Sequence, residues 1–309
     1  MSRPGSVTIV EVGPRDGLQN ERAAVSTAAK IAFIDALSDA GLPVVEVSAF
    51  VSPKWVPQMA DAGEVARGIR RRAGTRYTAL VPNLAGLDRA HDAGLDEVAI
   101  FAAASETFSA KNINQSIGAS LEGYRAVCQH AAALGIRVRA YLSTAFGCPF
   151  EGDVPVETVA RISGELIAMG AFEVSVSDTI GVAHPGQVPR VLEAVASRIG
   201  IEQVALHFHD TRGTALANVL AALDLGIATF DASAGGLGGC PYAPGATGNL
   251  ATEDLVYMLD GLGMETGVNL AAVVEASAAM AASVGHAPAS RYFRAVRAST
   301  RPGAPRPSS

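Results

Sequence analysis

The sequence predicts an α/β fold, a (β/α)8 or TIM barrel with an additional C-terminal helical segment. Short apolar runs of β type alternate with Ala-rich segments of helical spacing, and eight such units are typical of a closed parallel barrel. The chain has 309 residues, of which 49% are hydrophobic, and α/β barrels commonly use about 250 residues or more as one domain. No GxGxxG motif follows the first strand, which makes an open dinucleotide-binding sheet the weaker interpretation.

The predicted elements follow one another in a regular order. The predicted strands are 7–13, 44–50, 76–82, 96–104, 137–144, 172–178, 203–210 and 229–234. Helices are predicted between them, for example at 26–41, 116–134, 156–170 and 213–226, where apolar residues recur at i, i+3 and i+4. Several of these helices are followed by glycine, which favours the left-handed conformation of a helix end.

The segment after the eighth strand has a different character. A helical pattern at 269–285 comes after the barrel is complete and predicts an added helix. The last residues, from 297, are rich in Pro, Ser and Arg. We therefore expect a catalytic domain over 1–290, which includes this helix, and a disordered tail over 291–309.

Composition narrows the class of protein. No apolar run reaches the roughly 18 residues that span a membrane, and the first residues lack the apolar core of a signal peptide. Three cysteines fit a reduced compartment better than a disulfide framework. The net charge of −6 argues against nucleic acid as a partner. We expect a soluble cytoplasmic protein with neither a nucleic-acid nor a membrane partner.

The most informative motif is the run VALHFHD at 204–210. Side chains alternate along a strand, so His207 and His209 project from the same face, and Asp210 follows at the strand's end. The pair could hold a divalent metal or could be two hydrogen-bonded core histidines. Nitrogen and oxygen ligands suit Mg²⁺ or Mn²⁺ as well as Zn²⁺.

Other polar residues stand where a barrel places its catalytic groups, toward the carboxyl ends of strands. Arg15 and Asp16, within GPRDG at 13–17, end the first strand; Glu46 lies in the second, and Asp178 ends the sixth. The GPRDG run could be a turn with a surface salt bridge. Projected into the barrel mouth, Arg15 could instead neutralise an oxyanion, and Asp16 could bind a metal.

The stretch AGGLGGCPYAPGATGN at 234–249 has the most unusual composition in the chain. So many glycines exclude a helix or an ordinary strand. It could be a flexible linker, or a mobile lid that brings Cys240 over the site and ends at Asn249. Cys128 falls in a predicted helix and is expected in the core, while Cys148 follows the fifth strand and could face the mouth.

Two further segments after strands offer cations. The segment 48–61 contains the only Trp and Lys54, and could cover the site or pack on a neighbour. The segment 104–116 offers Lys111 and Asn112, which could meet an anionic ligand or lie in a solvated loop.

Taken together, these motifs resemble the hydroxymethylglutaryl-CoA lyase family. The matching runs are VEVGPRDGLQNE, SAFVSPKWVPQMAD, FAAASETFSAKNIN, GCPFEG, SDTIGVAHPG, HFHDTRGTALAN and GLGGCPYAPGATGNLATEDLVYMLDGLG. They cover nearly the whole chain up to about residue 270. The long cysteine-containing loop is the specific part, whereas RDG and HxHD are shared with related aldolases and synthases.

The resemblance implies a metal-dependent carbon–carbon lyase of leucine degradation and ketone-body formation, which cleaves 3-hydroxy-3-methylglutaryl-CoA to acetyl-CoA and acetoacetate. The implied ligands of the metal, Mg²⁺ or Mn²⁺, are Asp16, His207, His209 and Asn249. The implied catalytic residues are Arg15, Asp16, Glu46, Asp178, His207 and Cys240. The residues that it links with the CoA moiety are Lys111 and Asn112. A homodimer is also expected.

Three alternatives stay open at this point. The enzyme could prefer a longer 3-hydroxy-3-alkylglutaryl-CoA, since pocket size cannot be inferred from one sequence. The barrel could bind CoA without catalysis, although so complete a set of polar residues argues against this. A condensing synthase would usually carry a further regulatory domain, for which this chain has no room.

Overall fold

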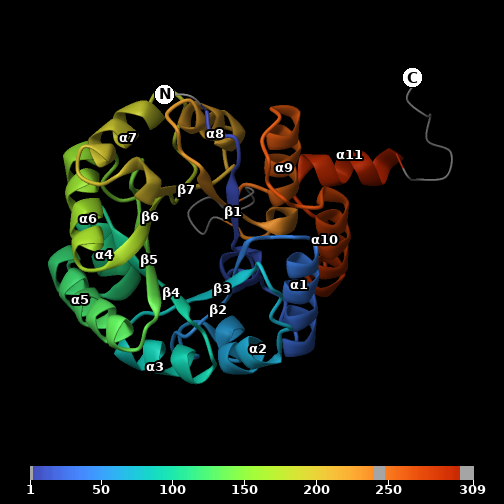
Figure 1. Cartoon of the computed structure of the whole chain (residues 1–309), viewed down its shortest axis with the longest axis horizontal. Coiled ribbons are helices and arrows are strands. Elements are labelled where there is room, and N and C mark those ends of the chain that lie inside the picture. The colour runs from blue at the N-terminus through green and yellow to red at the C-terminus, as the bar shows by residue number, and fades with distance from the viewer. Residues whose placement is uncertain (1–2, 240–247, 300–309) are drawn as a thin grey trace.

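The structure, a computed structural model, describes residues 3–239 and 248–299. Eight parallel strands close into a barrel in chain order, with the last strand paired to the first (Figure 1). The strands are β1 (Thr8–Glu11), β2 (Val44–Ala49), β3 (Arg76–Leu80), β4 (Glu97–Ala103), β5 (Arg137–Ser143), β6 (Ala171–Asp178), β7 (Val204–Phe208) and β8 (Thr229–Ala232). The predicted barrel is confirmed, and every observed strand overlaps the run predicted for it.

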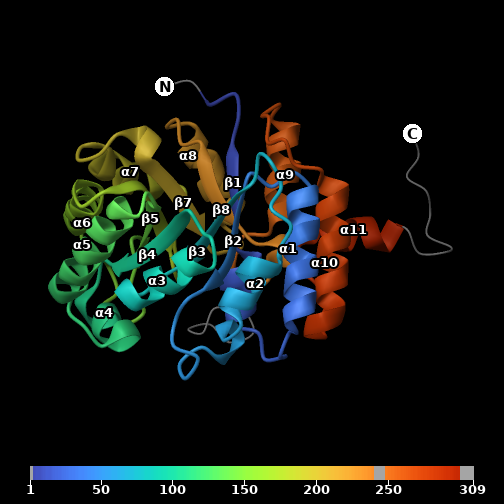
Figure 2. The ribbon, with the colours of Figure 1, turned by 60° about the horizontal axis from the view of Figure 1, so that its bottom comes forward.

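Helices surround the barrel and cover its outer face (Figures 1 and 2). They are α1 (Thr27–Asp39), α2 (Ala62–Gly68), α3 (Leu84–Asp92), α4 (Glu106–Ile113), α5 (Ile117–Ala133), α6 (Val156–Ala168), α7 (Val188–Ala196), α8 (Ala215–Leu223), α9 (Thr252–Gly261), α10 (Leu270–Val284) and α11 (Arg291–Ser299). The predicted added helix is α10, which packs against α1. None of the helices in the described part of the chain is long and apolar enough to cross a membrane.

The strands are buried on both faces. Because side chains alternate along a strand, one set faces the apolar core between barrel and helices, and the other set faces the inside of the barrel. All six residues of β2 are buried, and Val45 and Val47 belong to the large apolar core between barrel and helices. Glu46, between them, is fully buried and points into the barrel, where it meets Arg15. The inside of the barrel therefore holds charged groups, and these have to be paired.

Helices form in two segments where the sequence suggested a loop or a disordered tail. The segment 104–116, where a solvated loop was one interpretation, contains α4. Ser105 is the N-cap of this helix, and its Oγ accepts the Phe108 N–H at 3.1 Å. The tail predicted as disordered from residue 291 begins instead with α11. Residues 300–309 lie outside the described residues.

The start of α11 is fixed by a buried acceptor rather than by its own composition. The Asp254 carboxylate in α9 accepts hydrogen bonds from Ser290 Oγ (2.7 Å), Arg291 N (3.0 Å) and Tyr292 N (2.8 Å). These bonds satisfy helix-start donors that would otherwise have no partner. A tertiary contact thus orders a segment whose composition suggested disorder.

Candidate functional site

The residues after β1 form a tight π-helical turn, Gly13–Gly17, at the carboxyl end of the barrel. The Val12 carbonyl accepts the N–H groups of Arg15 (3.1 Å), Asp16 (2.8 Å) and Gly17 (3.2 Å). Packing requires glycine at position 17, since a Cβ there would lie 2.8 Å from Leu237 Cβ, and a Cβ on Gly13 would displace the Glu11 oxygen that lies 2.6 Å away. This turn is therefore the device that aims Arg15 and Asp16 at the barrel mouth.

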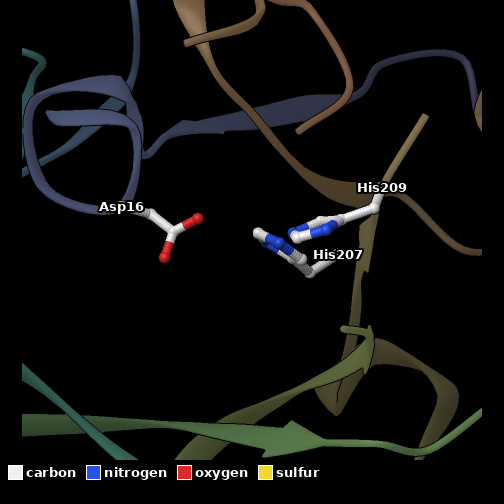
Figure 3. A group of neighbouring side chains, drawn as sticks. All are labelled: Asp16, His207 and His209. Carbon is white, nitrogen blue, oxygen red and sulfur yellow. The ribbon is translucent and has the colours of Figure 1, made fainter. Parts of the chain in front are cut away.

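Asp16, His207 and His209 converge at this mouth, as Figure 3 shows. Each offers one ligand atom, and these atoms all lie within 4.8 Å of one another. His207 and His209 lie side by side, with ring centroids 5.1 Å apart, as the alternation of β7 predicts. In the described part of the chain, this is the one cluster of three or more His, Cys, Asp or Glu side chains that could hold a metal ion.

Asn249 lies beside this cluster. Its backbone pairs with that of His209, and its Nδ2 donates to Asp16 Oδ2 at 2.8 Å and to the Leu237 carbonyl at 3.1 Å. Its Oδ1 is buried, and no described residue bonds it. The structure therefore brings the fourth predicted ligand to the other three.

The donor set fits a divalent cation. Buried polar atoms normally have partners, yet His209 Nδ1 and Asn249 Oδ1 have none among the described residues. Burial opposes ionisation of Asp16, but the positive charge of Arg15, together with His207 and the hydrogen bond from Asn249, outweighs it and lowers the Asp16 pKa to about 2. Burial also lowers the pKa of His209 to about 3. Asp16 is thus an anion and His209 a neutral imidazole, which are the forms that bind metals.

Arg15 stands next to the cluster and is held from two sides. Its Nε donates to Glu46 Oε2 at 2.6 Å, its Nη1 donates to Asp16 Oδ1 at 2.7 Å, and it lies 5.4 Å from the centre of the Tyr141 ring. Burial opposes its charge, but the two carboxylates outweigh this and raise the guanidinium pKa. The alternative of a surface salt bridge is wrong, because Arg15 and Glu46 are both buried.

Asp178 is fully buried at the end of β6, where its carboxylate accepts the backbone N–H groups of Val182 (2.9 Å) and Ala183 (3.1 Å). Burial raises its pKa to about 6. In this geometry Asp178 shapes the loop after β6.

The remaining predicted residues lie elsewhere or outside the described range. Lys111 and Asn112 lie on exposed positions of α4, and Lys111 Nζ is 3.9 Å from the centre of the Phe150 ring. Asp210 faces α8 and α11, since it accepts from Ala215 N and pairs with Arg291. Cys240, the predicted lid residue, lies outside the described residues.

The other two cysteines are buried. Cys128 is in α5, as predicted, and Cys148 Sγ lies 2.9 Å from Ser105 Oγ.

One group of polar residues near the site was not predicted. Arg139, Tyr141, Ser175 and Asp231 are buried in β5, β6 and β8, and Asp231 lies 3.3 Å from His207. Polar residues inside apolar runs, such as RVRAYLS and TFDASA, were the available signal.

The HMGL-like family profile matches residues 6–280. This chain belongs to the HMGL-like family. Within this family it is 53% identical, over 96% of its length and 99% of the relative, to the 3-hydroxy-3-isohexenylglutaryl-CoA/hydroxy-methylglutaryl-CoA lyase of Pseudomonas aeruginosa. It is 55% identical, over 89% of its length and 85% of the relative, to the mitochondrial hydroxymethylglutaryl-CoA lyase of Bos taurus.

Solved structures of HMGL-like proteins have the same fold. A crystal structure of hydroxymethylglutaryl-CoA lyase from Pseudomonas aeruginosa matches with a TM-score of 0.95 and 53% identity, over 97% of this chain and 100% of that one. The HMG-CoA lyase of Acinetobacter baumannii, in complex with coenzyme A and 3-methylmalate, matches with a TM-score of 0.91 and 39% identity, over 97% of this chain and 98% of that one.

Proposed function

We propose that this protein is a hydroxymethylglutaryl-CoA lyase, which cleaves 3-hydroxy-3-methylglutaryl-CoA to acetyl-CoA and acetoacetate. The observation that carries the proposal is the convergence of Asp16, His207 and His209 beside a buried, oriented Arg15. The relatives named as lyases for this substrate support the assignment, since they match at 53% and 55% identity over most of the chain.

The metal site is assigned to Asp16, His207, His209 and Asn249, with Mg²⁺ or Mn²⁺ as the expected ion because the donors are nitrogen and oxygen without thiolate. A divalent cation held by these four residues would supply Lewis acidity, which would make the substrate hydroxyl more acidic and orient the substrate.

The reaction itself needs a base, an anion stabiliser and an acid. Asp16 takes the proton of the tertiary hydroxyl while His207 contributes as a ligand of the metal site, and this oxygen becomes the ketone oxygen of acetoacetate as the C2–C3 bond breaks. The bonding electrons move into the thioester as an enolate, whose oxygen Arg15 stabilises through N–H groups oriented by Glu46. Cys240 then protonates the enolate carbon to give acetyl-CoA. Asp178 holds the loop after β6 through the backbone N–H groups of Val182 and Ala183.

The CoA moiety is assigned to the surface near α4, where Lys111 and Asn112 are exposed. A lysine cation there suits the phosphates of CoA. The complex of the Acinetobacter baumannii relative with coenzyme A supports an acyl-CoA substrate for this protein. A homodimer in the cytoplasm remains part of the proposal.

The test is a product assay with metal control. The purified protein should form acetyl-CoA and acetoacetate with Mg²⁺ or Mn²⁺, lose activity after EDTA treatment, and regain it when the metal is restored. Full activity in protein shown by elemental analysis to be metal-free would refute the metal role. Tight CoA binding without acetoacetate would indicate a non-catalytic barrel.

A second candidate substrate has a specific observation in its favour. The Pseudomonas aeruginosa relative, which matches over 99% of its length, is named for both 3-hydroxy-3-isohexenylglutaryl-CoA and the methyl substrate. The comparison of kcat/KM for the two substrates decides between them. A strong preference for the isohexenyl chain would replace our first choice.

A further inference from the structure

The side of His207 that faces away from the mouth has its own polar partner. The register of β7 and β8 pairs His207 with Asp231, so both side chains enter the barrel at the same level. His207 Nδ1 lies 3.3 Å from Asp231 Oδ2. An imidazole that uses Nδ1 for such a bond has only Nε2 left for a metal.

Asp231 is itself held in place by neighbouring strands. Its Oδ1 accepts from Arg139 Nη2 at 2.7 Å, and its Oδ2 accepts from Ser175 Oγ at 2.8 Å. The same Arg139 donates through Nε to Glu173 Oε1 at 2.6 Å. Asp231, Arg139 and Ser175 are all completely or almost completely buried. A buried carboxylate that is held by Arg139 and Ser175 has little freedom to turn away from His207.

The packing around His207 adds to this restraint. The rings of His207 and Tyr141 lie nearly perpendicular, with a centroid distance of 6.4 Å and an angle of 87°, and the Arg139 guanidinium carbon lies 5.0 Å from the centre of the Tyr141 ring. His209 has a different environment, since its Nδ1 is buried and no described residue bonds it. The two histidines of the motif are therefore not equivalent.

We propose that Asp231 is a positioning residue for the metal site: its bond to Nδ1 fixes the tautomer and orientation of His207, so that Nε2 faces Asp16. Arg139 and Ser175 keep the Asp231 carboxylate in position for this task. The proposal rests on the proposed function in one respect, namely that His207 is a metal ligand. Outer partners of this kind typically change metal affinity about 10–100-fold when they are removed.

The main test is the affinity of the purified protein for Mn²⁺ alone, measured by calorimetry. In Asp231→Asn, a side chain of the same shape loses its charge and can present an N–H group to His207 Nδ1. We expect its Kd for Mn²⁺ to rise at least about 10-fold. The control is Glu173→Gln, which removes a carboxylate from the same guanidinium without touching His207, and its Kd should stay within about twofold of wild type. Wild-type affinity in a folded Asp231→Asn variant overturns the proposal.

A second measurement keeps the proposal testable if Asp231→Asn fails to fold. In wild-type protein labelled with ¹⁵N-histidine, the nitrogen shifts report which ring atom carries a proton, and a His207→Gln sample identifies the signal. We expect a proton on Nδ1 of His207; an unprotonated Nδ1 overturns the proposal. Neither this readout nor Mn²⁺ binding uses the acyl-CoA substrate. Inactivity toward 3-hydroxy-3-methylglutaryl-CoA would therefore count against the proposed function alone.

Discussion

At the scale of single residues, the site is a set of buried charged groups, some of which have more hydrogen-bond partners than others. Arg15 has Asp16 and Glu46 within hydrogen-bond distance, whereas Glu46 keeps one buried oxygen that no described residue bonds. A buried charge without a partner is costly, so the Arg15 guanidinium stays paired with Glu46 and Asp16. These two ion pairs fix its orientation. A developing oxyanion therefore meets a donor that is oriented before the substrate binds.

The first prediction concerns Arg15→Ala. We expect turnover to fall about 100-fold or more, because one donor to developing charge is typically worth roughly 3 kcal/mol. Affinity for Mn²⁺ should be largely kept, since none of the four assigned ligands is removed. The measurements are kcat and KM with saturating metal and the Kd for Mn²⁺. A change confined to KM would mean that Arg15 only holds the substrate.

The second prediction concerns Cys240→Ser. If the thiol protonates the enolate, the variant should fold and bind Mn²⁺ normally but turn over slowly, because a serine hydroxyl is far less acidic. Alkylation should inactivate the wild type, and a bound substrate analogue should protect it. The controls are Cys128→Ser and Cys148→Ser, which alter buried thiols outside the proposed chemistry. Near-normal turnover of Cys240→Ser would move the search for the acid to the histidines or Asp178.

At the scale of elements, a buried carboxylate at the end of β1 connects three segments near the barrel mouth. Glu11 Oε1 accepts the N–H groups of Gly13 (2.8 Å) and Ala234 (2.9 Å), and Oε2 accepts from Thr252 Oγ1 (2.7 Å). One side chain thus ties the Arg15 turn, the segment after β8 and the start of α9 together. These bonds favour its charged form, but burial outweighs them and raises the Glu11 pKa from 4.5 to about 7.

The third prediction is the pH dependence that follows from Glu11. The folded state holds the proton of the Glu11 carboxyl more tightly than the unfolded state. Its contribution to the free energy of unfolding is therefore fully present below pH 4.5 and is lost as pH rises through about 7. The free energy of unfolding should therefore fall by about 3 kcal/mol from this group. Urea unfolding at pH 5 and pH 8 should show a smaller fall in Glu11→Gln than in wild type.

The control for this experiment is Glu122→Gln on α5, an exposed carboxyl that should leave the pH dependence unchanged. Equal falls in wild type and Glu11→Gln would mean that burial does not raise the Glu11 pKa in the folded protein. Burial and, to a lesser degree, the charge of Glu11 raise the pKa of the buried Glu253, so the difference between wild type and Glu11→Gln reports Glu11 together with its effect on Glu253.

At the scale of the whole molecule, the chain after the barrel is fastened to its outside. The last described helix, α11, contacts α9, and α10 packs on α1 (Figure 2). The buried Asp254 of α9 links α9 to α11, since its carboxylate accepts hydrogen bonds from Ser290, Arg291 and Tyr292. Arg291 in turn pairs with Asp210 at 2.9 Å, directly after the histidine strand. The C-terminal helices are therefore part of the support for the β7 end.

The fourth prediction concerns Asp254→Ala. The variant should lose roughly 2 kcal/mol or more of unfolding free energy, because hydrogen bonds to a charged acceptor are lost and buried donors remain. The control is Glu275→Ala, which removes an exposed ion pair with Arg297 and should cost less than about 1 kcal/mol. Equal effects in urea unfolding would show that Asp254 is no more than a surface contact.

The sequence by itself determined the barrel and the residues at its mouth, because strand and helix periodicities are local properties of the chain. The alternation in VALHFHD was enough to place His207 and His209 on one face. That Asp16 and Asn249 join them was implied by the family resemblance and not by any local pattern, because strand register and barrel closure bring these distant segments together.

The same reason accounts for what the sequence did not indicate. Asp231 lies in an apolar strand, and nothing local distinguishes its side chain from that of any other inward polar residue. Its role follows from the β7–β8 register and from the Arg139 guanidinium that reaches it across the barrel. The start of α11 likewise depends on Asp254, a partner far away in the chain. Local pattern determines which elements form, whereas the partner of a buried charge is decided only when the barrel closes.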